Sequence, residues 1–260
     1  MKVSIIIVGE RKENYLSETI KSCLNQNYKN FEIILTYSNL QNLKLLKQKF
    51  KKKIIFKKVH LRLKNPIQDQ INKIKEGIKI SKGKYIFLLD GDDIFKKNKI
   101  KKIIELNKKK MICLDNHINL KNKKHFYYKN NKFKKNKIYR FLLNPWPNKI
   151  CTSCISGPKK LFDIFFSKNK SFKSKYLAID VLLIIFYLKK LLLVNNILTI
   201  KTKDPQGLDN NYSNFLSIIY WKRRVEQHQY LKKIHNINSS LEYFLCLLIL
   251  FFLKNLFKLI

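Results

Sequence analysis

The chain has 260 residues, and 45% of them are hydrophobic, which is enough apolar material for one large α/β domain or for one domain with a tail. Lys and Arg number 55 against 17 Asp and Glu, so the formal net charge is +38 and anionic partners have to be considered. The basic residues are scattered along the chain without a nucleic-acid-binding motif, so we expect no nucleic-acid partner.

The cysteine pattern argues against a metal or disulfide framework. Cys151 and Cys154 form a C-x-x-C pair with no second pair nearby, whereas a structural zinc site needs about four ligands and disulfide-rich secreted domains usually have an even number of cysteines. We therefore expect thiols in or near the core. The first apolar run, residues 3–8, is shorter than the apolar part of a signal peptide, so we expect a cytoplasmic chain.

Short apolar runs alternate with amphipathic segments in the first part of the chain. Strands are predicted at residues 3–8, 31–36, 54–58 and 85–89, and helices at residues 14–26, 40–50 and 67–81. This alternation predicts an α/β fold with a mostly parallel, doubly wound sheet flanked by helices.

The second part of the chain is less regular. Helices are predicted at residues 96–107, 158–166, 175–190 and 212–234, strands at residues 111–114, 150–156 and 191–200, and an exposed hairpin or loop at the Lys- and Asn-rich residues 121–137.

The fourth predicted strand ends in three carboxylates around one glycine, Asp90-Gly91-Asp92-Asp93. Ligands of open α/β sheets bind at the carboxyl ends of the strands. Carboxylates this close cannot all stay ionised without a counter-charge, and a Mg²⁺ ion that bridges to substrate phosphates would supply it. The alternative is a polar turn that caps the next helix, with Asp93 as the N-cap residue.

Three segments of the chain resemble glycosyltransferase family 2, the inverting transferases with a GT-A fold. The first is strand 3–7, then Tyr15-Leu16 and S-C-L-N-Q-N-Y-K-N-F-E-I-I at residues 22–34. The second begins at Gly77-Ile78 and runs into G-K-Y-I-F-L-L-D-G-D-D at residues 83–93. The third, weaker segment is residues 151–161 followed by Asp180.

The resemblance implies a role for each acid. Asp90 and Asp92 would hold a Mn²⁺ or Mg²⁺ ion that bridges the diphosphate of a nucleotide-sugar donor, and Asp93 would add a contact to this cofactor. Such a cation neutralises charge on the departing diphosphate. Asp180 would be the general base that takes the proton of the acceptor hydroxyl, and its apolar surroundings suit a carboxylate with a raised pKa. The alternative for Asp180 is a helix N-cap or a residue of the first helical turn.

The chain also differs from the family pattern. Residues 8–13 replace the usual P-T-Y-N-E stretch, and Tyr-Ser-Asn-Leu at residues 37–40 replaces D-D-G-S, so no carboxylate remains there to contact the nucleotide base. Ile179 stands where an acid precedes the catalytic Asp, and the Q-x-x-R-W motif of processive members is absent.

The C-terminal residues 241–260 are apolar apart from a few side chains such as Glu242, Lys254 and Lys258. A membrane-spanning helix needs about 20 apolar residues, and the lysines interrupt this run. We therefore expect a helix that lies on an anionic membrane surface. The alternative is a core helix that packs on the rest of the fold.

From these features we expect a GT-A-like domain at residues 1–205, with a nucleotide-sugar half (1–95) and an acceptor half (96–205), and a helical extension at residues 206–260. The expected activity is a metal-dependent, inverting glycosyltransferase of the hexosyltransferase type, peripheral on the inner face of the membrane. Its acceptor would be a hydroxyl of a surface glycan or a lipid-linked glycan. The alternatives are a non-catalytic relative that assists glycan assembly and, less favoured, a basic nucleic-acid-binding protein.

Overall fold

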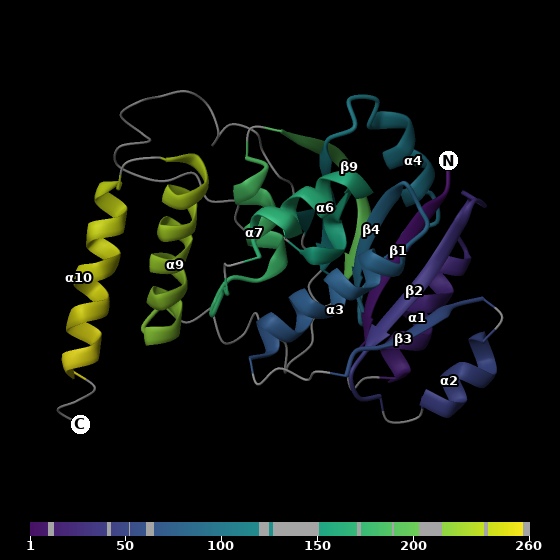
Figure 1. Cartoon of the computed structure of the whole chain (residues 1–260), viewed down its shortest axis with the longest axis horizontal. Helices are drawn as coiled ribbons and strands as arrows, with labels where there is room; N and C mark the ends of the chain where they lie inside the picture. Colours follow the sequence, from purple (N-terminus) through teal and green to yellow (C-terminus); the bar gives the residue numbers. More distant parts are fainter. Residues whose placement is uncertain are drawn as a thin grey trace.

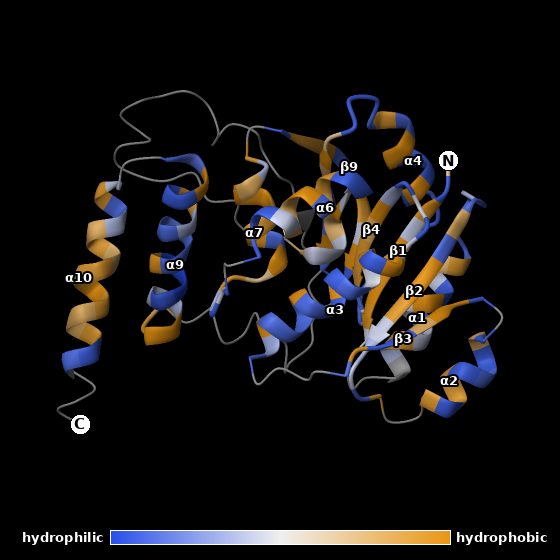
Figure 2. Ribbon diagram, in the orientation of Figure 1, coloured by the Kyte–Doolittle hydropathy of each residue, from blue (hydrophilic) through white to orange (hydrophobic). Residues whose placement is uncertain are grey.

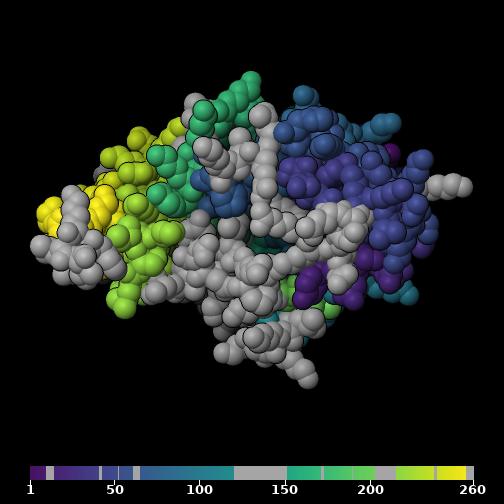
Figure 3. All heavy atoms as spheres, turned by 90° about the horizontal axis from the view of Figure 1, so that it is seen from below, coloured from purple at the N-terminus to yellow at the C-terminus, as the bar shows by residue number. Residues whose placement is uncertain are grey.

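The structure is a computed structural model. It describes residues 1–9, 13–40, 43–51, 53–60, 65–119, 125–126, 151–170, 173–188, 190–202, 215–236 and 239–256. Figure 1 shows a central sheet with flanking helices and, at one end of the molecule, the two helices α9 and α10. The space-filling view from below also places the C-terminal helices at the end opposite the N-terminal strands and helices (Figure 3).

Within the described residues one nine-stranded sheet has the order β3-β2-β1-β4-β8-β6-β9-β5, and β7 pairs with β6. The strands are β1 (Val3–Gly9), β2 (Phe31–Tyr37), β3 (Ile55–Lys58), β4 (Tyr85–Asp90), β5 (Ile94–Phe95), β6 (Ile112–Asn119), β7 (His125–Phe126), β8 (Ile155–Pro158) and β9 (Leu191–Lys201). Parallel pairs join β3 to β2, β2 to β1, β1 to β4 and β6 to β9, while β8 is antiparallel to both β4 and β6. Because β8 is antiparallel to both of its neighbours, β4 and β6 run in the same direction. The predicted mostly parallel sheet is confirmed.

Helices cover both faces of this sheet, and α9 and α10 lie at one end of the molecule. The helical elements are α1 (Glu13–Leu24), α2 (Leu43–Phe50), α3 (Pro66–Ile80), α4 (Lys99–Leu106), the 3-10 turn η2 (Thr152–Cys154), α6 (Lys159–Lys168), α7 (Ile179–Phe186), α9 (Ile218–His235) and α10 (Leu241–Leu256). Side chains of a strand alternate between faces, so Ile5 and Ile7 of β1 pack with α1, α2 and α4, while Ile6 and Val8 pack with α3, α6 and α7. This burial on both faces explains the uninterrupted apolar run of β1.

The C-terminal helix α10 packs on α9 with one face only. Trp221 and Val225 of α9 meet Cys246 and Leu250 of α10 in a small separate core, whereas much of the remaining surface of α10 is apolar and exposed (Figure 2). No helix among the described residues is long and apolar enough to cross a membrane.

The strand elements of the second part differ from their predicted limits where polar groups are buried. The strand predicted at residues 111–114 continues to Asn119, because Asp115 is buried in an ion pair with Lys99 and so breaks the apolar pattern without ending the strand. Of the strand predicted at residues 150–156, the part Thr152–Cys154 is the 3-10 turn η2, and only the last two residues belong to β8. The two-residue strand β5 is too short for any periodic signal and was not predicted.

The helix predicted at residues 96–107 begins at Lys99, and two further predicted helices also begin later than expected. Residues 175–178 are not helical, because the Ser174 hydroxyl bonds both the N–H and the carbonyl of Leu177 and so holds a local turn before α7. Helix α9 begins after Ser217, whose hydroxyl accepts a hydrogen bond from the Tyr220 N–H as an N-cap. The loop predicted at residues 121–137 lies outside the described residues apart from β7.

All five cysteines are free and buried, as the spacing predicted.

Candidate active site

The acid turn, residues 90–93, follows the carboxyl end of β4 in the middle of the sheet. The Asp93 N–H bonds the Asp90 carbonyl at 3.2 Å and closes the turn. A Cβ at Gly91 would lie 2.7 Å from the Val8 carbonyl oxygen of β1, so only glycine fits here. Helix α4 begins at Lys99, well beyond the turn, and the alternative of Asp93 as its N-cap is therefore wrong.

Polar residues of α1, together with Gln26 just after its end, hold the acid turn and the segment that follows it. The Thr19 hydroxyl donates to the Gly91 carbonyl (3.0 Å), and the Ser22 hydroxyl accepts from the Phe95 N–H (3.1 Å). The Gln26 amide donates to the Lys96 carbonyl (3.0 Å) and accepts from the N–H of Ile100 in α4 (3.2 Å). Ser22 and Gln26, part of the first resembling segment, thus support the acids of the second.

The other end of β4 is held by Glu32. Its carboxylate accepts hydrogen bonds from the Ser4 hydroxyl (2.6 Å) and from the N–H groups of Lys82 (2.6 Å) and Gly83 (3.1 Å). Burial alone would raise the pKa of Glu32, but these hydrogen bonds and the charge of Lys2 hold its pKa below the ordinary value. Gly83 has no room for a side chain, because a Cβ would lie 2.4 Å from the Ser4 hydroxyl. Both ends of the strand that carries the acids are therefore fixed.

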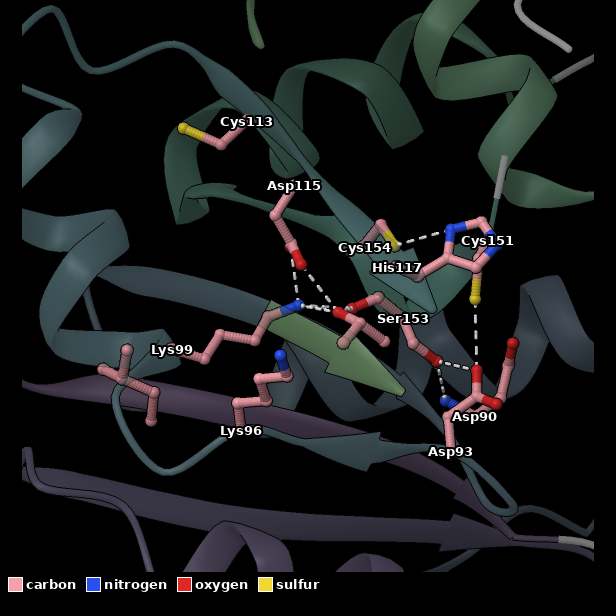
Figure 4. A network of polar contacts seen from close by, with 12 residues as sticks. Asp90, Asp93, Lys96, Lys99, Cys113, Asp115, His117, Cys151, Ser153 and Cys154 are labelled. Carbon is pink, nitrogen blue, oxygen red and sulfur yellow. Dashed lines mark hydrogen bonds and ion pairs between the residues drawn. The ribbon is translucent and has the colours of Figure 1, made fainter. Parts of the chain in front are cut away.

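Asp93 is a buried carboxylate, 1% exposed, that bonds Ser153 and Cys151 (Figure 4) and also the end of β9. Its Oδ2 accepts from the Ser153 hydroxyl (2.6 Å) and the Cys151 thiol (3.1 Å), and its Oδ1 accepts from the Thr202 N–H (3.1 Å). Burial raises the pKa of Asp93, while these donors and Lys201 lower it. With donors on both oxygens, Asp93 ties η2 and the end of β9 to the acid turn.

Asp90 is partly exposed and faces several other carboxylates. Its Oδ1 accepts from the Gln70 amide of α3 at 2.9 Å, and its N–H donates to the Ser153 hydroxyl at 3.0 Å. Burial raises its pKa well above the ordinary value, and so do the negative charges of Asp93, Asp92 and Asp180, while Lys201 lowers it.

The structure therefore brings all four sequence-predicted acids into one electrostatic neighbourhood. Asp92 is partly exposed, and its backbone carbonyl accepts a hydrogen bond from the Thr202 hydroxyl. Asp180, 8% exposed, lies in the first turn of α7 and accepts from the Val181 N–H at 2.7 Å. The N-cap of α7 is Ala178, so the alternative of Asp180 as the N-cap is wrong, whereas its predicted place in the first turn is right.

The donor set suits a hard divalent cation better than a soft one. Asp90, Asp93 and Cys151 each offer a ligand atom within 4.8 Å of the others. The pKa of Cys151 is raised well above the ordinary value, by its hydrogen bond with Cys154 and by burial, so this thiol stays protonated and is a poor metal ligand. A carboxylate with a raised pKa among other carboxylates gains most from an added positive charge, and oxygen ligands of this kind suit Mg²⁺ or Mn²⁺.

Four residues that support the acids were missed by sequence reasoning: Gln70, Ser153, Lys201 and Thr202. Gln70 lies on α3, Ser153 in η2, and Lys201 and Thr202 at the end of β9. Each is far from residues 90–93 along the chain, and only the fold brings them together. Only Ser153 had a local signal in the sequence. It lies between two cysteines in the polar segment 151–154, inside a stretch that was predicted as an apolar strand.

Residues 37–40, which differ from the D-D-G-S of the family pattern, begin at the end of β2. Tyr37 pairs with Gly9 of β1 in parallel register, is 4% exposed, and accepts the Val59 N–H at 2.8 Å through its backbone carbonyl. The carboxyl edge at β2 thus carries a buried phenol ring where the family pattern has an acid.

The family model described as "Glycosyl transferase family 2" matches residues 4–165, which include β1, the acid turn and η2. The chain belongs to glycosyl transferase family 2. This match confirms the family resemblance inferred from the motifs.

Curated relatives of this family 2 chain match somewhat more than a third of it. An uncharacterized glycosyltransferase of Haemophilus influenzae is 36% identical over 110 residues, which are 39% of this chain and 31% of the relative. One of Rickettsia conorii is 38% identical over 100 residues, or 38% of this chain and 16% of the relative. The matched segment thus spans less than a third of either relative.

Solved structures extend the likeness of this family 2 fold to nearly the whole chain. The structure of S. aureus TarS 1–349 with UDP-GlcNAc has a TM-score of 0.61 and 16% sequence identity, and the match covers 96% of this chain and 70% of that one. The complex of the same protein with UDP gives a TM-score of 0.60, with 14% identity and coverage of 96% and 70%. The predicted GT-A-like architecture is confirmed at the level of the fold.

Proposed function

We propose that the chain is a glycosyltransferase of the hexosyltransferase type, which moves a sugar from a nucleotide-diphosphate donor to an acceptor hydroxyl with inversion. The observation that carries this proposal is the acid turn Asp90-Asp92-Asp93 at the carboxyl end of β4, near enough to Asp180 of α7 for its charge to act on Asp90, in a family 2 chain. The fold likeness to a protein crystallised with UDP-GlcNAc supports a nucleotide-sugar donor.

In this proposal Asp90 and Asp92 hold a Mg²⁺ or Mn²⁺ ion. The Gln70 amide orients Asp90 by its hydrogen bond to Oδ1, and Asp93, whose two oxygens already accept donors, fixes the turn and adds negative charge next to the ion. When bound, the cation neutralises the charge that develops on the leaving diphosphate.

The proposed general base is Asp180. Inversion requires a base on the side of the sugar opposite the leaving group, which takes the proton of the attacking hydroxyl. Asp180 projects from another element than the metal-binding acids, α7 rather than β4, and its charge still reaches Asp90. Because these carboxylates lie on separate elements, Asp180 can act on the acceptor while Asp90 and Asp92 act on the donor.

The activity is tested with purified protein, a panel of UDP- and GDP-sugars, and either Mn²⁺ or EDTA. We expect slow hydrolysis of at least one donor and a rise in melting temperature that needs both Mn²⁺ and the nucleotide. Asp163→Asn, which changes an exposed acid of α6, is the matched control and should behave as the wild type. No hydrolysis and no metal-dependent binding with any donor would favour the non-catalytic alternative.

We also propose that α10 docks on an anionic membrane surface from the cytoplasmic side, where the acceptor is a lipid-linked or surface glycan. The large exposed side chains of its free face are Phe244 (58% exposed), Leu245 (49%), Leu248 (52%), Phe251 (60%) and Phe252 (56%). Phe215 and Leu216, just before α9, are 57% and 68% exposed, and Lys232 and Lys233 in the last turn of α9 add positive charge. An exposed apolar helix face beside basic residues is typical of interfacial binding.

Docking is tested by co-sedimentation with phosphatidylcholine vesicles with and without phosphatidylserine. Phe251→Asp should weaken binding to the anionic vesicles, whereas Leu45→Asp, at a leucine of α2 that is 62% exposed, should not. Equal binding of both variants would contradict the assignment of α10, and steep, salt-sensitive binding to RNA or DNA instead would favour the nucleic-acid alternative.

A further inference from the structure

A buried lysine lies directly behind the acid turn. Lys99, the first residue of α4, is 0% exposed. Its ammonium donates to Asp115 Oδ1 (2.6 Å), the Thr199 hydroxyl (2.6 Å) and the Ser153 carbonyl (2.7 Å), and it lies 4.3 Å from the centre of the Phe95 ring. All three protons of the ammonium are therefore used, as a buried charge requires.

Both carboxylate oxygens of Asp115 have hydrogen-bond donors without any contact from Ser153. The second carboxylate oxygen of Asp115 accepts from the Thr199 hydroxyl at 2.7 Å, so Lys99 and Thr199 occupy both oxygens. The contact from Lys99 to the Ser153 carbonyl is thus an additional link, which leads out of the ion pair toward the acid turn (Figure 4).

Ser153 is the residue through which this link reaches the acids. Its carbonyl accepts from Lys99, while its hydroxyl donates to Asp93 Oδ2 and accepts the N–H of Asp90. Ser153 lies in the three-residue turn η2, which has no side-chain cap of its own. A short turn of this kind depends on outside contacts for its position, and Lys99 supplies a charged one.

A second connection runs along β9 in the same direction. Thr199 belongs to the buried ion-pair cluster, and three residues later the N–H of Thr202 donates to Asp93 Oδ1. The cluster therefore reaches both oxygens of Asp93 by two routes, through η2 and through the end of β9.

We propose that Lys99 is a positioning residue for the acid turn, which sets through Ser153 the orientation of Asp90 and Asp93 and thereby the affinity of the site for a divalent cation with a nucleoside diphosphate. This inference rests on the proposed function for its ligand. Its structural half, the control of the turn by Lys99, does not.

The chain offers a matched control for the burial of a lysine. Lys73 of α3 is also 0% exposed and forms an ion pair with Asp69 at 2.7 Å. Removal of either ion pair deletes one buried ammonium and one buried carboxylate, so the cost to global stability is of the same kind. Lys99 in addition bonds the backbone of η2 at Ser153.

The experiment compares Lys99→Met/Asp115→Asn with Lys73→Met/Asp69→Asn. Amide hydrogen exchange of residues 90–93 is measured in the metal-free proteins, and Mn²⁺ affinity in the presence of UDP is measured by electron paramagnetic resonance. We expect the first variant to exchange faster at Asp90 and Asp93 and to bind Mn²⁺ about 10-fold more weakly, as for other partners that support metal ligands. The second variant should match the wild type in both measurements.

A double-mutant cycle tests whether Lys99 acts through Ser153. If it does, Ser153→Ala weakens Mn²⁺ binding by a similar factor, and its combination with Lys99→Met/Asp115→Asn adds little further loss. Should the double variant fail to fold, Thr199→Val removes one partner of Lys99 without changing charge, and we expect a smaller change in the same direction.

The outcomes separate the two proposals. Unchanged exchange at residues 90–93 in a folded Lys99→Met/Asp115→Asn or Thr199→Val variant would overturn the role of Lys99, and so would equal losses in the Lys73 control. If the wild type binds no Mn²⁺ with UDP, the proposed function fails, and the exchange measurement still decides whether Lys99 positions the turn.

Discussion

The two ends of the molecule depart from the usual distribution of polar and apolar groups in opposite ways. At the acid turn, carboxylates such as Asp93 are buried and held by donors from η2 and β9, whereas on α10 large apolar side chains such as Phe251 face outward. Buried polar groups and exposed apolar patches are the informative exceptions in a soluble fold. The proposed function assigns a ligand to each end, a cation with a diphosphate at the first and a lipid surface at the second.

The largest expected effect distinguishes the roles of the acids. Asp180→Asn should lower turnover by about 10² to 10⁴, or roughly 3 to 5 kcal/mol of barrier, because the amide cannot accept a proton. Donor affinity should change little, since the proposed ligands of the cation are Asp90 and Asp92. Steady-state kinetics with a separate donor-binding titration check both parts. A near-normal turnover number would leave the base unassigned and would reduce Asp180 to a residue of the first helical turn.

Loss of Asp92 should instead abolish metal-dependent donor binding while the fold survives. We expect Asp92→Ala to weaken Mn²⁺-dependent UDP binding by about 10- to 100-fold or more, the range found even for partners that only support metal ligands. The control is Asp163→Asn, and circular dichroism confirms folding. If Asp92→Ala retains the wild-type affinity, Asp90 must pair with another ligand, and Asp93 is the nearest candidate.

The strands and the acids were predictable from the sequence for the same reason. Apolar runs such as residues 3–8 are buried on both faces of the sheet, and Asp90, Asp92 and Asp93 are neighbours along the chain at the end of such a run. Their supports were not predictable, because Ser153, Lys201 and Thr202 reach the turn only when β4, η2 and β9 meet. The distinct role of Asp93 depends on three donors from distant segments, and no spacing of residues encodes them.

The same physical reason explains the elements that were misjudged. Asp115 is polar and fully buried because Lys99 neutralises it, and a search for apolar runs therefore ends β6 too early. The start of α7 depends on the side-chain contacts of Ser174, which compete with the helix locally. In both cases the limit of the element depends on a partner for a polar group, a distant one for Asp115 and a local one for Ser174.

At the opposite end of the molecule, Phe251→Asp should reduce partition to anionic vesicles by about 10-fold, since burial of a phenylalanine is worth roughly 1.5 to 3 kcal/mol and a helix at the interface recovers part of it. Point substitution is preferable to removal of α10, which would expose Trp221 and Val225 of the small core with α9. Partition that equals the wild type would show that the exposed face of α10 serves another partner.

The smallest expected effect concerns stability and pH. In the metal-free protein the pKa of Asp90 is raised in the folded state, so the folded state takes up a proton as pH falls through that pKa, while the unfolded state does so only near its ordinary value of about 3.9. The contribution of Asp90 to the free energy of unfolding should therefore rise as pH falls from neutral toward the ordinary pKa of about 3.9. Asp90→Asn should stabilise the metal-free protein at neutral pH and flatten this dependence in urea unfolding curves. A steeper dependence in the variant would contradict a raised pKa of Asp90 in the folded state.

Calorimetric titration of UDP into the protein tests the central claim most directly, with Mn²⁺ or EDTA in the buffer and with Asp90→Asn/Asp92→Asn as the comparison. The arrangement of the four acids predicts saturable binding to the wild type that requires Mn²⁺ and is lost in the double variant, while Asp163→Asn binds normally. Binding of equal strength with EDTA, or in the double variant, would contradict a cation-dependent donor site at the acid turn.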